Sequence, residues 1–276
     1  MSPSILITND DGIQAEGIQV LSQKIYQAFG ERMNIYILAP DHEQSAVSNA
    51  ITMHRPLRIE TVRFLHNHQL TAWAVNGTPT DCVKLAIETL LPEMPDLIIS
   101  GINRGSNLGT DVLYSGTVAA ATEGAILGVP SIAISLTEEK EPGYEVAADF
   151  ICQFIPRILE HKLPEGTILN INVPPGHLNQ IEGIRATKLG DRCYKNTFEE
   201  RIDPRGRSYY WLAGDIVETD KDESYDVGAI KRNYISITPL RFDITGYNFL
   251  SSVEEITDDL HSFFQQESSS EASPEK

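Results

Sequence analysis

The sequence predicts an α/β fold of three layers, in which a mostly parallel sheet lies between two layers of helices. Short apolar segments of strand length alternate with longer segments whose apolar residues recur every three or four positions. The short segments are apolar at nearly every position, as expected for parallel strands that are covered on both faces. Polar loops follow several of these segments, so the pattern is that of repeated strand–loop–helix units.

The first unit begins with a predicted strand at Ile5–Ile7, which is apolar and rich in β-branched residues. The turn formers Asn9–Gly12 end this strand. A helix is expected from about Gly17, because one face of it would be apolar, formed by Ile18, Leu21, Ile25 and Phe29. Ligands of such sheets bind outside the carboxyl ends of the strands, which is where Asp10 and Asp11 lie.

The next segments continue the alternation, and together they predict a Rossmann-like sandwich. Further strands are expected at residues 34–39, 57–62, 70–75, 96–100, 131–135 and 168–173. The strands at 57–62 and 70–75 flank a polar loop, as in a hairpin. A helix is expected from about Pro79, capped by Thr78 or Thr80, and ends by Pro92. Two more helices are expected, one starting within residues 114–124 and one over about 144–160.

After about Pro174 the pattern changes to isolated strands between long polar stretches. Strands are expected at residues 184–189, 208–212 and 234–240, with polar stretches at 197–207 and 217–226. We interpret this region as a β-rich arm used in oligomerisation, because long loops are often functional or bound by a partner. An amphipathic helix is expected over about 253–265. The organisation is a single domain, 1–266, with a core of about 1–180, the arm and helix at 181–266, and a disordered Ser/Glu-rich tail at 267–276.

The composition excludes several classes of protein. The net charge of −17 argues against a binder of duplex nucleic acid, which needs a basic surface, and any anionic substrate must be attracted locally. The three cysteines, Cys82, Cys152 and Cys193, form no C-x-x-C pair, so we expect reduced, mostly buried thiols and a cytoplasmic protein. No signal peptide and no membrane-spanning segment are expected.

Four polar segments at predicted strand ends gather the candidate chemistry: Asp10 and Asp11, then Ser45, then Asn103, then Ser115–Thr117. Adjacent carboxylates repel each other unless a proton or a cation lies between them. Together with a serine hydroxyl and an asparagine carbonyl they form an all-oxygen set that suits Mg²⁺ or Mn²⁺. His42 is the single histidine in these loops, so zinc is less favoured. For the Asp-Asp-Gly segment alone, a solvated polar turn is the competing interpretation.

Ser115, Gly116 and Thr117 precede a predicted helix, so their backbone N–H groups and hydroxyls can form an anion pocket. The competing interpretation is an ordinary helix cap. The glycine-containing loop at residues 100–109 has neither the G-x-G-x-x-G spacing nor a following Gly-Lys-Ser/Thr. A dinucleotide-binding oxidoreductase and a P-loop protein are therefore disfavoured.

An ordered set of motifs from about residue 5 to 260 resembles the SurE family of survival-protein nucleotidases. The motifs are the opening Thr8–Gly12, the loop with Asp41, Ser45, Ser48 and Asn49, and the segments 77–82, 100–109, 114–121, 168–174, 203–206 and 234–240. The resemblance implies a metal-dependent 5′-nucleotidase that hydrolyses nucleoside monophosphates, with 3′-nucleotidase or exopolyphosphatase activity in addition. It implies metal ligands at Asp10, Asp11, Ser45 and Asn103. It also implies a homodimer or homotetramer that exchanges C-terminal segments.

Our mechanistic hypothesis is hydrolysis of a phosphate monoester, with Asp10 or Asp11 as general base and the other as a ligand. Asn9 and Ser115–Thr117 would hold phosphoryl oxygens. The rival hypotheses are a mechanism through a phosphorylated aspartate and a non-catalytic metal or nucleotide sensor. Thr8 stands where the family commonly has serine. Arg104 occupies a variable position, where it either adds positive charge near the phosphate or is a solvated loop residue.

Overall fold

The computed structural model describes residues 2–63, 70–138, 143–195, 197–218, 222–258 and 260. The chain forms two compact units, residues Met1–Phe242 and Asp243–Lys276. Within the described residues, no helix is long and apolar enough to cross a membrane.

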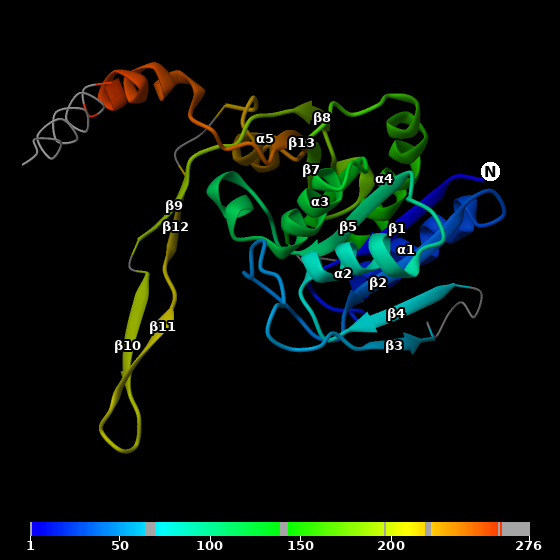
Figure 1. The fold of residues 1–276 in the computed structure, drawn as a ribbon, viewed down its shortest axis with the longest axis horizontal. Helices are drawn as coiled ribbons and strands as arrows, with labels where there is room; N and C mark the ends of the chain where they lie inside the picture. Colours follow the sequence, from blue (N-terminus) through cyan, green and yellow to red (C-terminus); the bar gives the residue numbers. More distant parts are fainter. Residues whose placement is uncertain are drawn as a thin grey trace, which may run out of the picture. The chain divides into compact units, whose positions relative to one another are not determined.

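The first unit is built on a nine-stranded sheet with the order β3-β4-β2-β1-β5-β6-β7-β13-β8 (Figure 1). Its strands are β1 (Ser4–Thr8), β2 (Asn34–Pro40), β3 (Ile59–Val62), β4 (Thr71–Val75), β5 (Leu97–Arg104), β6 (Ser131–Leu136), β7 (Thr167–Val173), β8 (Gly183–Ala186) and β13 (Tyr234–Arg241). Neighbouring strands run parallel except in the pairs β3–β4 and β7–β13. The mostly parallel sheet that the sequence predicts is thereby confirmed.

Helices cover both faces of this sheet, as the three-layer prediction requires. They are α1 (Glu16–Phe29), α2 (Pro79–Leu85), α3 (Gly116–Ile126) and α4 (Gly143–Glu160). Side chains alternate across a strand, so Ile5 and Ile7 pack in one core with α1 and α4, while Leu6 packs in the other core with α2. The predicted apolar face of α1 is buried in the first of these cores. Strand β1 contributes side chains to both cores, so its position is fixed on both faces. The turn that follows β1 is fixed with it.

The helix predicted from Pro79 is confirmed, including its cap. The Thr78 hydroxyl accepts a hydrogen bond from the Asp81 N–H at 3.1 Å, and the Asp81 carboxylate accepts one from the Thr78 N–H at 2.9 Å. This reciprocal pair is a capping box, which satisfies two N–H groups that the helix leaves unpaired. The final turn, Ala86–Leu90, is a π-helical turn that the sequence analysis did not anticipate.

The central strand β5 is longer than predicted. We expected it to end at Ser100, whereas it continues to Arg104 through an irregularity between Ser100 and Asn103. Within this irregularity, a side chain at Gly101 would lie 2.3 Å from the carbonyl oxygen of Ile134, so only glycine fits. Asn103 is therefore held by the sheet itself and does not lie in a free loop.

The region after Pro174 differs from the prediction in its pairing. The expected strands at 184–189 and 234–240 are not part of a separate β-rich arm, because β8 and β13 extend the main sheet beyond β7. Outside that sheet lie two two-stranded ribbons, formed by β9 (Arg192–Lys195) with β12 (Asp215–Glu218) and by β10 (Phe198–Ile202) with β11 (Ser208–Leu212). Strand β11 was predicted, whereas β10 lies in the stretch 197–207 and β12 overlaps the stretch 217–226, both of which we expected to be polar connections. Strand β9 and the short helix α5 (Asp226–Lys231) were not predicted.

The second unit contains a short 3₁₀ turn, Tyr247–Phe249, and a helix over residues 250–258. The helix predicted over 253–265 thus begins earlier, and residues 261–265 lie outside the described residues, as does the predicted disordered tail 267–276. All three cysteines are free. Cys82 is buried as expected, whereas Cys152 is half-buried and Cys193 is exposed, so the expectation of mostly buried thiols is wrong.

Candidate functional site

The predicted site lies at the carboxyl end of β1, where the chain turns immediately after Thr8. The Asn9 side-chain amide donates a hydrogen bond to the Gly12 carbonyl at 2.9 Å, and the Ile13 N–H donates to the Pro40 carbonyl at 2.8 Å. These bonds fix the turn and join it to the end of β2. Asn9 is fully buried, so its side chain shapes the turn, and its role in holding phosphate stays a prediction.

Asp10 is a buried carboxyl group whose pKa is shifted by its surroundings. It is only 4 % exposed, and its Oδ1 accepts a hydrogen bond from the Thr117 hydroxyl at 2.5 Å. Burial raises the pKa of this carboxyl from 3.8 to about 7; the Thr117 bond opposes the shift and the neighbouring Asp11 charge adds to it. Gly116 lies directly against it, because an added Cβ would be 2.8 Å from the Asp10 Cβ.

Asp11 connects the turn to the end of β5. Its Oδ2 accepts a hydrogen bond from the backbone N–H of Arg104 at 3.0 Å. The neighbouring Asn103 donates its side-chain amide to the Gly105 carbonyl at 2.8 Å, which leaves the carbonyl oxygen Oδ1 as the atom not used by this bond. Asp11, in the turn after β1, and Asn103, near the end of β5, thus lie at the same edge of the sheet, because β1 and β5 are adjoining strands.

The loop after β2 brings Ser45 to the same edge. The Gln44 N–H donates to the Asp10 carbonyl at 2.7 Å, which places Ser45 one residue from a direct contact with the turn. The Ser45 hydroxyl donates to Glu43 Oε1 at 2.7 Å. Ala46 and Ser48 have φ angles of 56° and 52°, conformations that non-glycine residues adopt rarely and that are often found at functional sites.

The hydroxyl groups of Ser115 and Thr117 have different hydrogen-bond partners. The Ser115 hydroxyl caps α3 by accepting a hydrogen bond from the Val118 N–H at 3.1 Å. The Thr117 hydroxyl is bound to Asp10. The helix-cap interpretation therefore holds for Ser115, and the hydroxyl of Thr117 supports a carboxylate. The predicted binding of phosphate by residues 115–117 stays a prediction.

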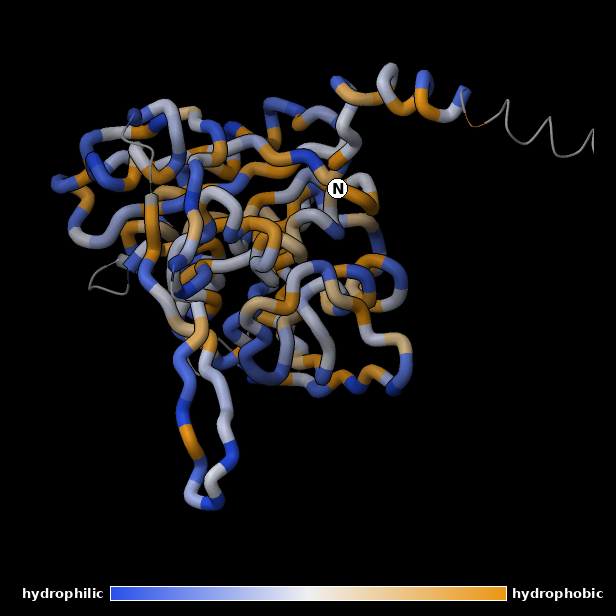
Figure 2. Tube along the Cα trace, turned by 90° about the vertical axis from the view of Figure 1, so that its left-hand side faces the viewer, coloured by the Kyte–Doolittle hydropathy of each residue, from blue (hydrophilic) through white to orange (hydrophobic). Residues whose placement is uncertain are grey.

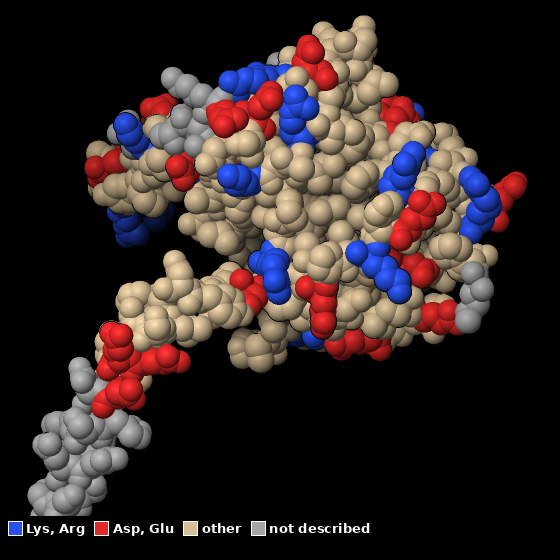
Figure 3. All heavy atoms as spheres, turned by 90° about the horizontal axis from the view of Figure 1, so that it is seen from above, with Lys and Arg blue, Asp and Glu red and all other residues tan. Residues whose placement is uncertain are grey.

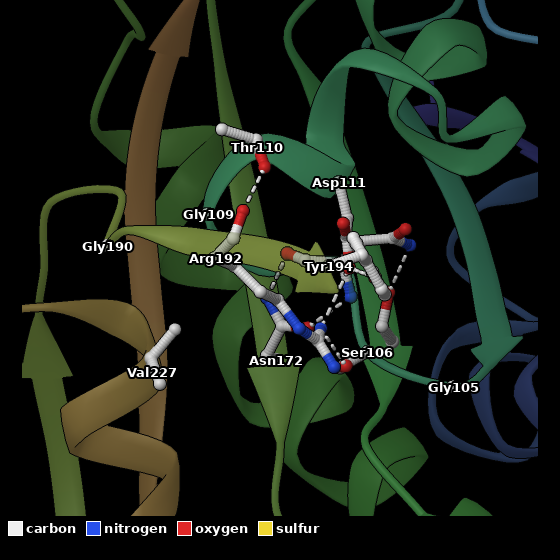
Figure 4. Close-up of polar contacts among 12 residues, drawn as sticks. Gly105, Ser106, Gly109, Thr110, Asp111, Asn172, Gly190, Arg192, Tyr194 and Val227 are labelled. Carbon is white, nitrogen blue, oxygen red and sulfur yellow. Dashed lines mark hydrogen bonds and ion pairs between the residues drawn. The ribbon is translucent and has the colours of Figure 1, made fainter. Parts of the chain in front are cut away.

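A second layer of contacts holds the loop that joins β5 to α3 (Figure 4). Arg192, at the start of β9, directs its guanidinium into this loop, where Nη1 lies 2.9 Å from Ser106 Oγ and 2.9 Å from Asp111 Oδ2. The Arg192 carbonyl accepts a hydrogen bond from the Thr110 hydroxyl at 2.6 Å, and the Tyr194 hydroxyl donates to Asp111 Oδ2 at 2.7 Å. The ribbon strand β9 is thus attached to the site loop.

The same loop is held from the inside by buried polar groups. The Asn107 N–H donates to Asn172 Oδ1 at 2.9 Å, and the Asn107 carbonyl accepts from the side chains of Asn170 and Asn172. Asp226, at the start of α5, is fully buried and accepts hydrogen bonds from the N–H groups of Gly109 and Gly190, each at 2.8 Å. Loop 105–111 is consequently fixed on both sides.

The structure therefore brings the four predicted segments together at one sheet edge. This edge offers oxygen atoms from two carboxylates, a hydroxyl and an amide as possible metal ligands. Burial beside Asp11 raises the pKa of Asp10, and a cation would offset the two like charges. Among the described residues, no group of three or more His, Cys, Asp or Glu side chains could hold a metal ion. A cation here would need neutral oxygens such as Ser45 and Asn103 in addition to the carboxylates.

The sequence analysis missed several residues that support the site. Glu43, Arg192 and Asp226 each contact a site segment, but only the last two come from positions far along the chain. Glu43 stands between Asp41 and Ser45, so its position in a strand-end loop was a signal that could have identified it. For Arg192 and Asp226 no local pattern was available, because their contacts depend on the fold.

Comparisons with known proteins give the family of the chain. Residues 5–196 match the model of the family described as survival protein SurE. A protein of Heliobacterium modesticaldum named 5′-nucleotidase SurE is 50 % identical over 251 residues, which are 91 % of this chain and 90 % of the relative. A Synechococcus elongatus protein of the same name is 46 % identical over 259 residues, covering 92 % and 99 %.

The fold is also that of a solved structure. The crystal structure of the SurE protein from Aquifex aeolicus superposes with a TM-score of 0.78 at 36 % identity, covering 92 % of this chain and 100 % of that one. The family match spans more than half of the chain, including all four site segments. The chain belongs to the survival protein SurE family.

Proposed function

We propose that the chain is a phosphatase that hydrolyses nucleoside monophosphates to nucleoside and phosphate, a 5′-nucleotidase, at the Asp10–Asp11 site. The observation that carries the proposal is the juxtaposition of two adjacent carboxylates with residues of three other strand-end segments. Relatives about 50 % identical over most of the chain are named 5′-nucleotidase. Nothing in these findings favours a non-catalytic sensor. Activity on 3′-nucleotides or polyphosphate is part of the proposal as a secondary activity.

We propose one divalent cation per subunit, Mg²⁺ or Mn²⁺, held by Asp10, Asp11, Ser45 and Asn103. These residues supply oxygen atoms only, which is the preference of both ions. The burial of Asp10 next to Asp11 supports the assignment, because a cation there would offset two like charges. When bound, such a cation supplies Lewis-acid stabilisation of the phosphoryl group and acidifies a bound water.

The protein groups would then perform the remaining steps. Asp10 or Asp11 accepts the proton of the attacking water as general base, while the other carboxylate stays a ligand. Water adds to phosphorus as the bond to the nucleoside oxygen breaks, so the products are inorganic phosphate and a nucleoside that takes up a proton. Asn9 and Ser115–Thr117 orient the phosphoryl oxygens. The Thr117 hydroxyl and the Gly116 backbone, both in contact with Asp10, keep that carboxylate in position.

The experiment that tests this function is phosphate release from a panel of nucleoside monophosphates and short polyphosphates, with Mg²⁺, Mn²⁺ or EDTA. The expected result is turnover of monophosphates that requires the cation and stops with EDTA. A folded sample that binds Mn²⁺ but releases no phosphate from any member of the panel would reject the phosphatase and support the sensor.

We also propose that the chain forms a homodimer or homotetramer through its C-terminal region, residues 181–266, and that residues 1–266 act as one domain. The support lies in the β10–β11 ribbon, whose register puts four exposed apolar side chains on one face: Phe198, Ile202, Tyr210 and Leu212, each at least 60 % exposed. An isolated two-stranded ribbon is only marginally stable in water. In Figure 2 the hairpin is mostly hydrophilic to neutral in colour, with short hydrophobic pieces. The three free cysteines support a cytoplasmic location.

A further inference from the structure

We infer that Arg104 binds the phosphate group of the substrate. Before phosphate binds, Glu43 holds the Arg104 guanidinium at the mouth of the site, and phosphate then displaces the Glu43 carboxylate. The inference deepens the proposed function, on which it rests, by naming the residue that recognises the dianionic group. Arg104 and Glu43 lie in two different site segments, the end of β5 and the loop after β2. Their contact joins those segments on the exposed side of the site.

The first reason is the charge of the site. A phosphate monoester carries close to two negative charges near neutral pH, with a second pKa of about 6. The chain carries a net charge of −17, and the site segments contribute the carboxylates of Asp10, Asp11, Asp41, Glu43 and Asp111. Residues 9–15, 40–50 and 100–117 contain a single lysine or arginine, which is Arg104. Arg104 is thus the cationic side chain that these segments provide for an anion.

The second reason is the position of Arg104. Its backbone N–H donates to Asp11 Oδ2 at 3.0 Å, so the residue begins within one hydrogen bond of a predicted metal ligand. Its side chain is 53 % exposed and extends to Glu43, where Nη2 lies 3.7 Å from Oε2. Glu43 Oε1 accepts the hydroxyl of Ser45 at 2.7 Å. Arg104 is therefore attached to Asp11 through its backbone N–H, and its guanidinium is linked to Ser45 through Glu43.

The third reason is the weakness of the ion pair. Both side chains are about half exposed and the contact is long, so water screens it and it contributes little to stability. A guanidinium forms two parallel charge-assisted hydrogen bonds with phosphate, a geometry that the present contact with Glu43 does not have. Exchange of the carboxylate for phosphate is therefore favourable, and Glu43 acts as a competing anion that is released on binding.

The competing interpretation is that the ion pair only fastens two loops together. The two interpretations predict different results when Arg104 and Glu43 are removed one at a time. If the pair is a fastener, removing either partner has the same effect on phosphate binding. If Arg104 binds phosphate and Glu43 competes with it, the two removals have opposite effects.

The test is calorimetric titration of inorganic phosphate into the Mg²⁺-loaded full-length protein. The samples are the wild type, Arg104→Gln, Arg104→Lys and Glu43→Gln. The matched control is Arg157→Gln, which removes the same charge from an exposed position in the last turn of α4. Arg104→Gln should weaken phosphate binding by about tenfold or more, and Arg104→Lys by less. Glu43→Gln should tighten it, and Arg157→Gln should leave it unchanged.

A Mg²⁺ titration of the same samples shows whether the metal site has survived, and it should give equal Mg²⁺ affinity in the wild type and Arg104→Gln. With AMP as substrate, Arg104→Gln should raise KM by a similar factor, with a smaller effect on kcat. Equal phosphate affinity in the wild type and Arg104→Gln would overturn the inference, as would no phosphate binding by either. Parallel loss in Arg104→Gln and Glu43→Gln would also overturn it, as would loss of Mg²⁺ binding in Arg104→Gln. Absence of AMP hydrolysis by the wild type would reject the proposed function instead, because phosphate titration does not depend on turnover.

Discussion

At the scale of single residues, Asp10 combines burial with a chemical task. Its environment raises the carboxyl pKa to about 7, first through burial and then through the charge of Asp11. A buried carboxylate next to another is costly unless something offsets the charge. Asp10 is therefore where the site conflicts most with the stability of the metal-free fold, as is common for functional residues.

This conflict predicts how the stability of the metal-free protein depends on pH. The pKa of Asp10 is about 7 in the folded chain against an ordinary value of 3.8, so the folded state binds this proton more tightly. The stabilisation of the folded state that comes from protonating Asp10 is fully present below about pH 4 and is lost as the pH rises to about 7. The loss is at most about 4 kcal/mol, from 1.36 kcal/mol per pKa unit. Urea unfolding in EDTA should show that Asp10→Asn gains stability relative to the wild type over this range; parallel curves would contradict the assignment.

Gly116 gives a second prediction at this scale. A methyl group at this position would lie 2.8 Å from the Asp10 Cβ, 3.0 Å from Oδ2 and 3.2 Å from the Gln44 carbonyl oxygen. Gly116→Ala should therefore displace Asp10 and lower kcat/KM for AMP by about tenfold or more, since small misplacements at a reacting centre are costly. The control is Gly246→Ala, where nothing lies within 4 Å of the new methyl. Equal activity of the two variants would show that the position of Asp10 is not critical.

At the scale of elements, the site depends on a loop that later parts of the chain hold in place. Loop 105–111 is bound by Arg192 of β9 and by Asp226 of α5, both of which follow it by more than 80 residues. The Asp226 carboxylate accepts three backbone N–H groups, from Gly109, Gly190 and Val227. Hydrogen bonds to a buried charged group are among the stronger ones in proteins.

Asp226→Asn should consequently destabilise the fold by about 2–4 kcal/mol, because the new amide would direct a donor at an N–H group and leave it unpaired. The matched control is Asp203→Asn, a partly exposed carboxylate that accepts the N–H groups of Arg205 and Arg207 in the β10–β11 turn and should cost less than about 1 kcal/mol. Chemical denaturation of both variants measures the difference. Equal and small losses would mean that Asp226 does not anchor the loop.

The helices and strands differ in how far the sequence predicts them. β1, α1 and the capped start of α2 are confirmed because a local apolar pattern or a cap determines each of them. The residues of β13 do not show that this strand belongs to the main sheet. Its partner β7 ends at Val173, 61 residues before β13 begins at Tyr234. The ribbon strand β10 is fully exposed and lacks the buried alternation that identifies a strand.

The same distinction holds for the candidate site. Asp10, Asp11, Ser45 and Asn103 could be selected because polar residues at the ends of parallel strands meet at one edge. The contacts that tune them, from Thr117 to Asp10 and from Arg104 to Asp11, join residues about 100 positions apart. Such contacts follow from the order β2-β1-β5 in the sheet, which no local pattern specifies. Their roles as metal ligands stay predictions.

At the scale of the whole molecule, surface charge and exposed apolar residues indicate different interactions. On the face seen in Figure 3, the Lys and Arg side chains that the structure describes are scattered among acidic ones and form no continuous basic surface. The β10–β11 ribbon instead exposes apolar side chains, among them Phe198 at 66 % and Leu212 at 77 %. A surface of this kind is typical of protein–protein contacts.

The proposed oligomer is tested on this ribbon. Phe198 and Leu212 lie opposite each other in the register and share a face. The double variant Phe198→Ser with Leu212→Ser should lower the molar mass measured by light scattering after size exclusion. Glu199→Ser, on the other face of the same ribbon, is the control and should leave the mass unchanged. A wild type that is monomeric, or a double variant with the wild-type mass, would contradict the role of this surface.

The central claim is that the adjacent carboxylates hydrolyse phosphate monoesters with a divalent cation. The measurement that tests it most directly is Mn²⁺-dependent release of phosphate from AMP by the wild type and by Asp11→Asn, prepared in parallel and compared by circular dichroism. The Asp11 carboxylate accepts a hydrogen bond from the backbone N–H of Arg104, and the substitution keeps the size of the side chain. The account predicts that the variant folds like the wild type and has lost turnover. Wild-type turnover in a folded Asp11→Asn variant would contradict the site.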